Sequence, residues 1–275
     1  MRRSNQLSYL ARGGEVACPE RFNFGKLPRL FEAANIYFFT STYQLIIDIK
    51  RPINVFSLIV NSALRHSSYI PFYIAYILFL IGGGIFLLST NRENTHLILN
   101  QFFYESLHLF FRNITHFGDG LAAFVIIIVS LFVSYKSALQ IGLTAVFAGG
   151  STQLLKNFVF DDINRPSWFF KYFSENSIQT IEGMDLNIHN SFPSGHTTTA
   201  FALYVSILLL TKKSKWTLFL TLLALVAGYS RVYLSQHFFV DIYFGSLMGT
   251  LWALLIFVAL GRLDKSWFQK SLLKR

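Results

Sequence analysis

The 275-residue chain is 53% hydrophobic and 17% aromatic, and only 14% of its residues are charged, against about 25% in soluble domains. This composition excludes an ordinary soluble domain and indicates that lipid is the solvent for much of the chain. The net charge of +10 first suggests a nucleic-acid partner, and the single cysteine, Cys18, excludes an internal disulfide framework.

The first part of the chain, residues 1–68, is predicted to be a cytoplasmic and interfacial segment. Within it, residues 29–47 are aromatic-rich and moderately apolar, and they end beside Asp48, Lys50 and Arg51. A helix lying on the membrane surface is the preferred interpretation, and a seventh membrane crossing is the alternative.

Six later stretches are apolar over nearly the length that a membrane-spanning helix needs, which is about 20 residues. They are residues 69–90, 118–135, 137–155, 194–211, 216–233 and 241–260. The predicted fold is therefore all-α, a six-helix transmembrane bundle over residues 69–260, with the N-terminal interfacial segment before it and a basic cytoplasmic tail, 261–275, after it. In the third stretch, the small residues Gly142, Gly149, Gly150 and Ser151 are expected to let helices approach closely.

Between the first two stretches, residues 97–117 place apolar and polar side chains at helical spacing. This segment is predicted to lie along the outer face of the membrane. The turn Gly118-Asp119-Gly120 closes it, and Asp119 is interpreted as a helix N-cap and not as a catalytic acid.

The positive charges support an arrangement with the N-terminus inside. The segments placed in the cytoplasm then hold 18 of the 24 Lys and Arg residues, which is the asymmetry that the positive-inside rule describes. The six outer ones are Arg92, Arg112, Lys156, Arg165, Lys171 and Arg231. Membrane topology thus accounts for the net positive charge of the chain, and no nucleic-acid partner is expected.

Three polar clusters stand at helix ends that this topology places on one side of the membrane. They are Lys156 with Arg165-Pro166, then Pro193-Ser194-Gly195-His196, then Ser230-Arg231 with His237 and Asp241. The clusters follow the third stretch, open the fourth, and join the fifth to the sixth.

The residue types in these clusters are those that phosphoryl transfer needs. His237 and Asp241 are four residues apart, so on a helical turn they share a face, and the carboxylate leaves the second imidazole nitrogen free to attack. His196 stands at a predicted helix N-terminus, where backbone N–H groups and the helix dipole favour an anion, and Gly195 lets that backbone come close.

Three cations complete the pattern. Lys156, Arg165 and Arg231 supply positive charge, and the planar fork of arginine suits phosphate oxygens. Two histidines, one carboxylate and three cations at a membrane surface indicate a phosphoryl-transfer site.

These residues resemble the signatures of the type 2 phosphatidic acid phosphatase (PAP2) superfamily of membrane lipid phosphatases. The family motifs are Lys followed by Arg-Pro, then Pro-Ser-Gly-His, then Ser-Arg, five residues, His, three residues and Asp. The second and third are matched in full, whereas eight residues separate Lys156 from Arg165 where the family usually has six. The motifs cover residues 156–241, and the six-span plan extends the resemblance to most of 69–260.

The resemblance implies a role for each position. His237 is expected to be the nucleophile that forms a phosphohistidine, Asp241 to orient it, and His196 to protonate the leaving group. The expected phosphate-binding residues are Lys156, Arg165, Ser194, Gly195 and Arg231. The family needs no metal, so neither a metal nor another cofactor is expected.

Two other acidic groups leave a metal site open as an alternative interpretation. They are Asp161 with Asp162, and Glu182 with Asp185 and His189 in the connection 167–190. A solvated loop is preferred for the first group, and a polar lid over the site is preferred for the connection.

The resemblance therefore implies a membrane-embedded enzyme that hydrolyses the phosphomonoester or pyrophosphate of a lipid. Candidate substrates are undecaprenyl pyrophosphate, phosphatidic acid, phosphatidylglycerol phosphate and lipid A phosphates. The alternative is a lipid phosphotransferase that uses the same phosphohistidine. Two further functions are less favoured: a vanadate-dependent haloperoxidase, against which the six spans argue, and a catalytically silent membrane scaffold. The expected partners are a lipid phosphate substrate and the bilayer, and the expected location is the plasma (inner) membrane, multi-pass, with the site facing the periplasm or outside.

Overall fold

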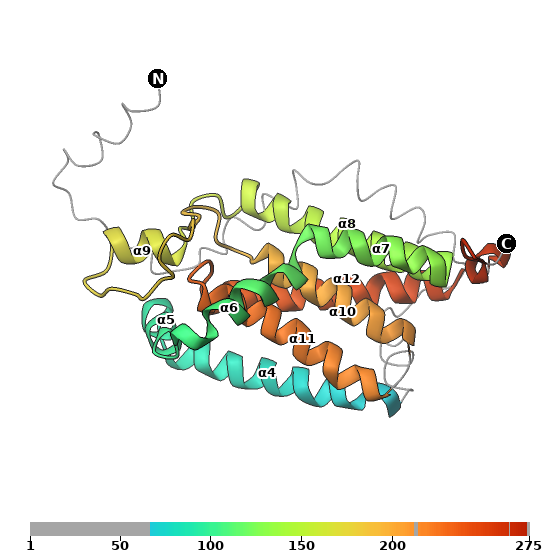
Figure 1. Ribbon diagram of the computed structural model, residues 1–275, viewed down its shortest axis with the longest axis horizontal. Coiled ribbons are helices and arrows are strands. Elements are labelled where there is room, and N and C mark those ends of the chain that lie inside the picture. Colours follow the sequence, from blue (N-terminus) through green and yellow to red (C-terminus); the bar gives the residue numbers. More distant parts are fainter. Residues whose placement is uncertain (1–66, 212–213, 264, 274–275) are drawn as a thin grey trace, which may run out of the picture. The chain divides into compact units, whose positions relative to one another are not determined.

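The computed structural model describes residues 67–211, 214–263 and 265–273, and every regular element within these ranges is a helix (Figure 1). The long helices are α4 (Ile70–Ser89), α7 (Gly120–Val133), α8 (Tyr135–Phe158), α10 (Gly195–Thr211), α11 (Ser214–Tyr233) and α12 (Phe239–Gly261). The short ones are α5 (Arg92–Asn100), α6 (Glu105–Ile114), α9 (Pro166–Tyr172) and the 3-10 turns η2 (Ser67–Tyr69), η3 (Thr115–Gly118) and η4 (Ser266–Gln269). The all-α prediction is confirmed, and each of the six apolar stretches coincides with one long helix. The interfacial helix predicted at 29–47 lies outside the described residues.

Several of these helices can cross a membrane. Four qualify by length and composition, namely Ser67–Ser89, Tyr135–Phe158, Lys215–Tyr233 and Phe239–Gly261. The pair formed by α6–η3 and α7 qualifies only when both parts are taken together, and α10 has 17 residues. The described residues thus hold four or five candidate spans by these criteria, where the sequence predicted six. Large apolar side chains face outward, with Leu88 91% and Leu121 70% exposed, as befits a multi-pass membrane protein.

The segment 97–117 is broken into two helices, since α5 ends at Asn100 and α6 begins at Glu105. After η3, the Asp119 carboxylate accepts a hydrogen bond from the backbone N–H of Ala122 at 2.9 Å. This N-cap confirms the predicted capping role of Asp119. Because the cap starts a new helix, the chain bends by 55° between η3 and α7. At about 1.5 Å per residue, the 14 residues of α7 are too short to cross about 30 Å of hydrocarbon alone.

The most buried helix is α10, which packs against α8, α11 and α12. Its side chains are buried on nearly all sides, including Phe201, Leu203 and Leu208, each at most 1% exposed. A helix that is apolar around its whole circumference is stable when lipid or neighbouring helices cover it, and neighbouring helices cover α10. The N-terminus of this central helix carries Gly195 and His196.

Close helix approach occurs at a glycine of α12. A Cβ atom added at Gly249 would overlap the carbonyl oxygen of Thr198 in α10. The glycines predicted for this role do not have it, because an added Cβ would meet nothing within 4 Å at Gly142, Gly149 or Gly150. The prediction was therefore wrong for these three glycines. Its fourth residue, Ser151, does contact a neighbouring helix, because its hydroxyl accepts a hydrogen bond from Nε1 of Trp252 in α12 at 3.0 Å.

The C-terminal residues 265–273 lie against the end of the bundle. The backbone N–H of Tyr135 donates to the carbonyl of Lys270 at 2.8 Å, and that of Leu272 donates to the carbonyl of Leu131 at 3.0 Å. Phe268, 4% exposed, packs with side chains of α8 and α12. Much of the predicted basic tail is therefore attached to the bundle.

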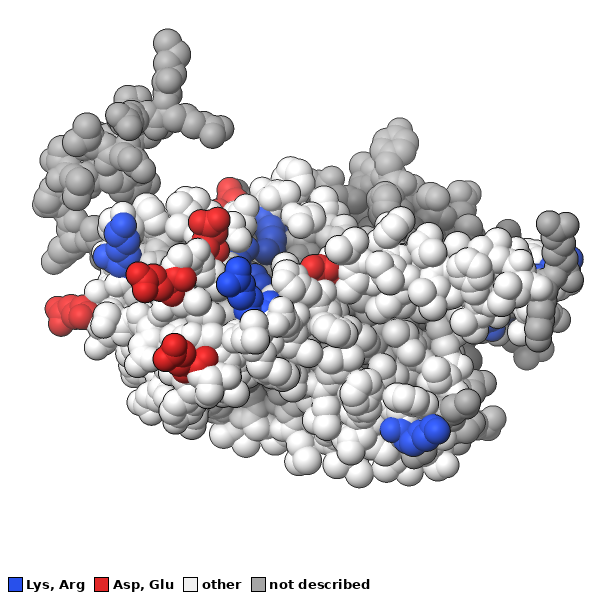
Figure 2. Space-filling view, viewed as in Figure 1, with Lys and Arg blue, Asp and Glu red and all other residues white. Residues whose placement is uncertain are grey.

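Charged side chains gather at the ends of the bundle. Figure 2 shows acidic and basic side chains at the end that carries α5 and α9, and Lys and Arg at the opposite end. The acidic residues at the first end include Glu93, Glu105, Asp161, Asp162, Glu175, Glu182 and Asp185. The basic residues at the opposite end include Lys136, Lys215, Arg262 and Lys270.

Candidate active site

The three motif segments meet at the end of the bundle that carries α5 and α9 (Figure 1). The residues come from four long helices and the turns beside them: Lys156 from the last turn of α8, Arg165 just before α9, Ser194, Gly195 and His196 at the start of α10, Arg231 from the last turn of α11, and His237 and Asp241 at the start of α12. All of them except Gly195 and His196 are buried, and these two are partly exposed.

His237 and Asp241 form a contact, although not on the shared helical turn that their spacing predicts. His237 lies in the turn before α12, Phe238 is the N-cap, and Asp241 lies in the first turn of the helix. The Nδ1 atom of His237 is 3.3 Å from Oδ2 of Asp241, and each residue is 1% exposed. With Nδ1 facing the carboxylate, Nε2 is the nitrogen available for attack.

The surroundings keep the His237 ring neutral. Burial lowers the pKa of His237 well below its ordinary value, and the positive charges of Arg165, Lys156 and Arg231 lower it further. A neutral imidazole has the lone pair that a nucleophile needs. The cations that suit a phosphate therefore also favour the reactive form of the histidine.

A segment formed by residues 185–191, here called the strap, holds two of the three cations. The Lys156 ammonium donates to the carbonyl of Asn190 at 3.0 Å. Nε of Arg165 donates to the carbonyl of His189 at 2.9 Å, and the Arg165 backbone N–H donates to Ile188 at 2.9 Å. The strap is thus attached directly to the first motif.

The Arg165 guanidinium also reaches the third motif. Its Nη1 donates to the carbonyl of Gln236 at 3.0 Å and to the side-chain oxygen of the same residue at 3.2 Å. Burial lowers the pKa of Arg165, and the negative charge of Asp241 acts in the opposite direction. Because Gln236 precedes His237, these bonds fix Arg165 next to the nucleophile.

Arg231 is held from a different direction. Its Nη1 donates to Oγ1 of Thr115 in η3 at 2.8 Å. Its Nε is buried and has no hydrogen-bond partner. A buried guanidinium N–H without a partner is rare in proteins, and a phosphate oxygen would satisfy it.

The start of α10 is anchored to α12. The backbone N–H of Ser194 donates to the carbonyl of Asp241 at 3.0 Å, and the Ser194 hydroxyl accepts from Oγ1 of Thr197 at 2.9 Å. The same hydroxyl accepts from the backbone N–H of Thr197 at 3.4 Å, so the fully buried Ser194 caps the helix. The partly exposed Gly195 and His196 lie at the positive end of the helix dipole, which favours an anion.

The residues considered as metal ligands are dispersed. Asp161, Asp162, Glu182 and Asp185 are exposed, and His189 bonds to Asn164 at 3.0 Å. In the described part of the chain, no three His, Cys, Asp or Glu residues are grouped so that they would hold a metal ion. The polar lid predicted for the connection 167–190 stays a prediction.

Comparison with known protein families matches residues 137–265 to the PAP2 superfamily, the family that the motifs resemble. The matched region is a little under half of the chain and contains every predicted site residue. This region is a PAP2 domain.

Individual proteins are also similar to this chain. The bacitracin transport permease protein BcrC of Bacillus licheniformis is 43% identical over 70 residues, which are 26% of this chain and 34% of that protein. The match thus spans about a third of the length of that relative. The crystal structure of Aquifex aeolicus LpxE has a TM-score of 0.51 at 24% identity and covers 58% of this chain and 91% of its own, which supports the fold. A transmembrane PAP2-type phosphatidylglycerolphosphate phosphatase of Bacillus subtilis has a TM-score of 0.45 at 22% identity, covering 72% and 99%.

Sequence reasoning missed three polar residues that hold the site together. They are Thr115, Ser191 and Gln236, which bond to Arg231, Asp241 and Arg165. Thr115 lies outside the PAP2 domain. Ser, Thr and Gln are frequent residues, and no spacing in the sequence distinguishes these three from the others.

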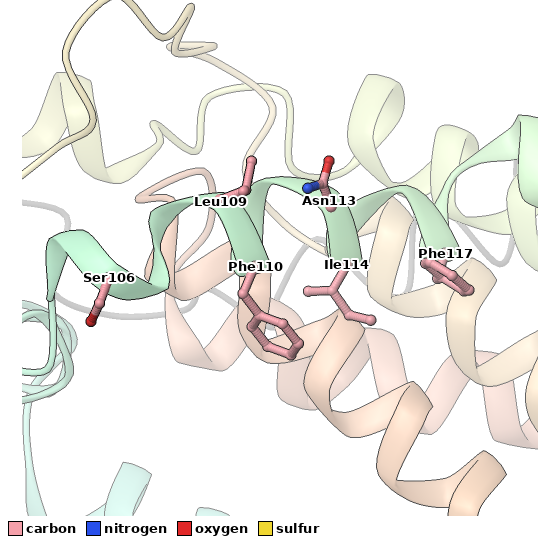
Figure 3. A pocket seen from close by; sticks show the side chains of 6 residues that line it. All are labelled: Ser106, Leu109, Phe110, Asn113, Ile114 and Phe117. Atoms are coloured by element: carbon pink, nitrogen blue, oxygen red, sulfur yellow. The ribbon is translucent and has the colours of Figure 1, made fainter.

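A shallow hollow of about 400 Å³ runs along α6 and η3, away from the buried cations (Figure 3). Its lining is largely apolar and comprises Ser106, Leu109, Phe110, Asn113, Ile114 and Phe117. The opposite face of the same segment carries Thr115, which bonds to Arg231. The hollow therefore belongs to the apolar outer surface and not to the polar site.

Proposed function

We propose that this protein is a membrane-embedded lipid phosphatase that removes the phosphate of a lipid phosphomonoester, or the terminal phosphate of a lipid pyrophosphate, through a phosphohistidine. The observation that carries the proposal is the buried His237 with its Nδ1 atom 3.3 Å from Oδ2 of Asp241. Burial and the charges of Arg165, Lys156 and Arg231 lower the pKa of His237, which favours the neutral ring. A site of this composition suits a phosphate dianion and presents a nucleophile to its phosphorus.

The first chemical step transfers the phosphoryl group to the histidine. Nε2 of His237 forms a bond to phosphorus while the bond from phosphorus to the leaving oxygen breaks. His196, at the partly exposed start of α10, begins this step as the imidazolium, donates its extra proton to that oxygen and becomes neutral. The leaving group is the lipid alcohol for a monoester and the lipid monophosphate for a pyrophosphate. Asp241 balances the positive charge on the phosphorylated imidazole.

The second step returns the enzyme to its starting state. A water molecule attacks phosphorus, His196 takes the proton of that water, and the phosphorus–nitrogen bond breaks. Inorganic phosphate leaves, and His237 is neutral again. The two steps use His196 first as an acid and then as a base, as microscopic reversibility requires.

The charge balance supports binding of a phosphate without further cations. Lys156, Arg165 and Arg231 together carry about three positive charges, against about two negative charges on a phosphate monoester. The unpartnered Nε of Arg231 offers one more donor. We therefore expect turnover that is independent of added metal.

We propose that the site faces the outer compartment of a plasma membrane. Of the 24 Lys and Arg residues, 18 fall in segments on the other side, which is the side that stays in the cytoplasm. Substrate would then enter from the outer leaflet, with its chains in lipid and its phosphate among the helix ends.

Phosphate release by the purified protein tests this function. A panel of phosphatidic acid, phosphatidylglycerol phosphate, undecaprenyl pyrophosphate and a lipid A phosphate would be incubated with protein in detergent, and free phosphate would be measured. We expect release from at least one of them and none from His237→Ala. The matched control is His116→Ala, which removes an exposed imidazole from η3. Equal activity of His237→Ala and the wild type would refute the mechanism, and no release from any lipid by the wild type would refute the function.

A further inference from the structure

Ser191 makes a short hydrogen bond to the carboxylate that orients the nucleophile. Its hydroxyl donates to Oδ2 of Asp241 at 2.5 Å. Ser191 is 0% exposed and Asp241 is 1% exposed, so water does not compete for this bond. A hydrogen bond to an ionised acceptor in a buried site is among the stronger ones in proteins.

The same carboxylate oxygen collects three donors. Oδ2 of Asp241 lies 2.5 Å from Oγ of Ser191, 2.9 Å from the backbone N of Phe238, and 3.3 Å from Nδ1 of His237. A buried carboxylate needs such donors, because burial without them is costly. The hydroxyl and the backbone N–H therefore fix the position of the oxygen that His237 must meet.

The position of Ser191 is itself determined by the rest of the site. Its backbone N–H donates to the carbonyl of Ile163 at 2.9 Å, in the loop that leads to Arg165. The residue before it, Asn190, accepts a hydrogen bond from Lys156. Ser191 thus lies where the strap, the first motif and the His237–Asp241 pair meet.

We propose that Ser191 is a positioning residue of the phosphatase. Its hydroxyl holds Oδ2 of Asp241 so that Nδ1 of His237 keeps its proton and Nε2 stays directed at phosphorus. Ser191 acts through Asp241 and is not required for holding the phosphate group, which the three cations bind. This inference rests on the proposed phosphatase function and adds a residue that lies outside the three family motifs.

The role of Ser191 predicts a selective effect on a transition-state analogue. Orthovanadate, which mimics five-coordinate phosphorus, would be titrated against the purified protein by calorimetry, and inorganic phosphate would be titrated in parallel. Because Ser191→Ala removes one hydrogen bond to a charged group, we expect vanadate affinity to fall about tenfold and phosphate affinity to stay close to the wild-type value. Ser191→Thr keeps the hydroxyl and should restore most of the vanadate affinity.

The matched control is Ser206→Ala in α10. Ser206 is also 0% exposed, and its hydroxyl bonds to Thr144 within the bundle. We expect this variant to bind both anions like the wild type. Melting temperatures measured alongside would show whether each variant is folded.

The outcomes separate this inference from the proposed function. Unchanged vanadate affinity in Ser191→Ala, or an equal loss of vanadate and phosphate affinity, would overturn the positioning role and leave the phosphatase function standing. Failure of the wild type to bind vanadate at all would overturn both. A selective loss of vanadate affinity supports the proposal, even before the lipid substrate is identified.

Discussion

His96 of α5 is a second buried histidine near the site, and it has no catalytic role in the proposed mechanism. Its ring centroid lies 5.5 Å from that of Phe170 and 5.4 Å from that of Phe238, and the residue is 0% exposed. Nε2 is 3.3 Å from the hydroxyl of Ser235, and Nδ1 has no partner. Burial lowers the pKa of His96 from 6.5 to about 4, so the folded protein holds this ring neutral at pH 7.

The lowered pKa makes stability depend on pH. The unfolded chain binds a proton at His96 more readily than the folded protein does. The contribution of the neutral ring to the free energy of unfolding is therefore fully present above about pH 6.5 and is lost as the pH falls toward 4. One pKa unit corresponds to about 1.4 kcal/mol. Proton linkage then lowers the free energy of unfolding, relative to its value at neutral pH, by about 2 kcal/mol at pH 5 and about 3 kcal/mol at pH 4.

Thermal unfolding in detergent between pH 7.5 and 5 measures this loss. The variant His96→Phe keeps an aromatic ring in the same place and removes the titrating group. We expect the melting temperature of the wild type to fall by about 4–8 °C more than that of His96→Phe over this range. His189→Ala, which removes an exposed histidine, should follow the wild type. Parallel curves for the wild type and His96→Phe would refute the reasoning.

Three further predictions concern the site and its orientation. Thr115→Val should weaken the inhibition of turnover by inorganic phosphate about tenfold, because it removes a hydrogen bond to the buried arginine of α11. The control is Thr144→Val, at a threonine that is also buried in the bundle, and it should leave this inhibition unchanged. Turnover should survive strong chelation and be inhibited by orthovanadate, and activity that is lost in chelator and restored by Mg²⁺ or Zn²⁺ would contradict a metal-independent mechanism. In a protein with Cys18→Ser, a cysteine placed at Ser177 should react with an impermeant reagent in intact cells and one at Ser214 should not, and the reverse pattern would invert the proposed topology.

Much of the architecture and part of the site follow from local patterns in the sequence. Apolar stretches predicted where the long helices lie, because burying a run of about 20 apolar residues in lipid is favourable whatever its neighbours are. The cap at Asp119 was predictable because it depends on residues within one turn. The four-residue spacing likewise indicated that His237 and Asp241 come into contact, although the turn before α12, and not a shared helical face, brings them together.

The contacts that hold the site in place required the tertiary structure. Ser191 and Asp241 are 50 residues apart, and Thr115 and Arg231 are 116 residues apart. A hydroxyl has the same local properties wherever it stands, so only helix packing decides which one meets a catalytic carboxylate or guanidinium. The packing glycine is a similar case, because Gly249 and the glycines of α8 all lie in apolar helices. Of these, only Gly249 must lack a side chain, since α10 packs closely against α12 at this position. Sequence by itself thus determined the residue types and their helices, and the fold decided their partners.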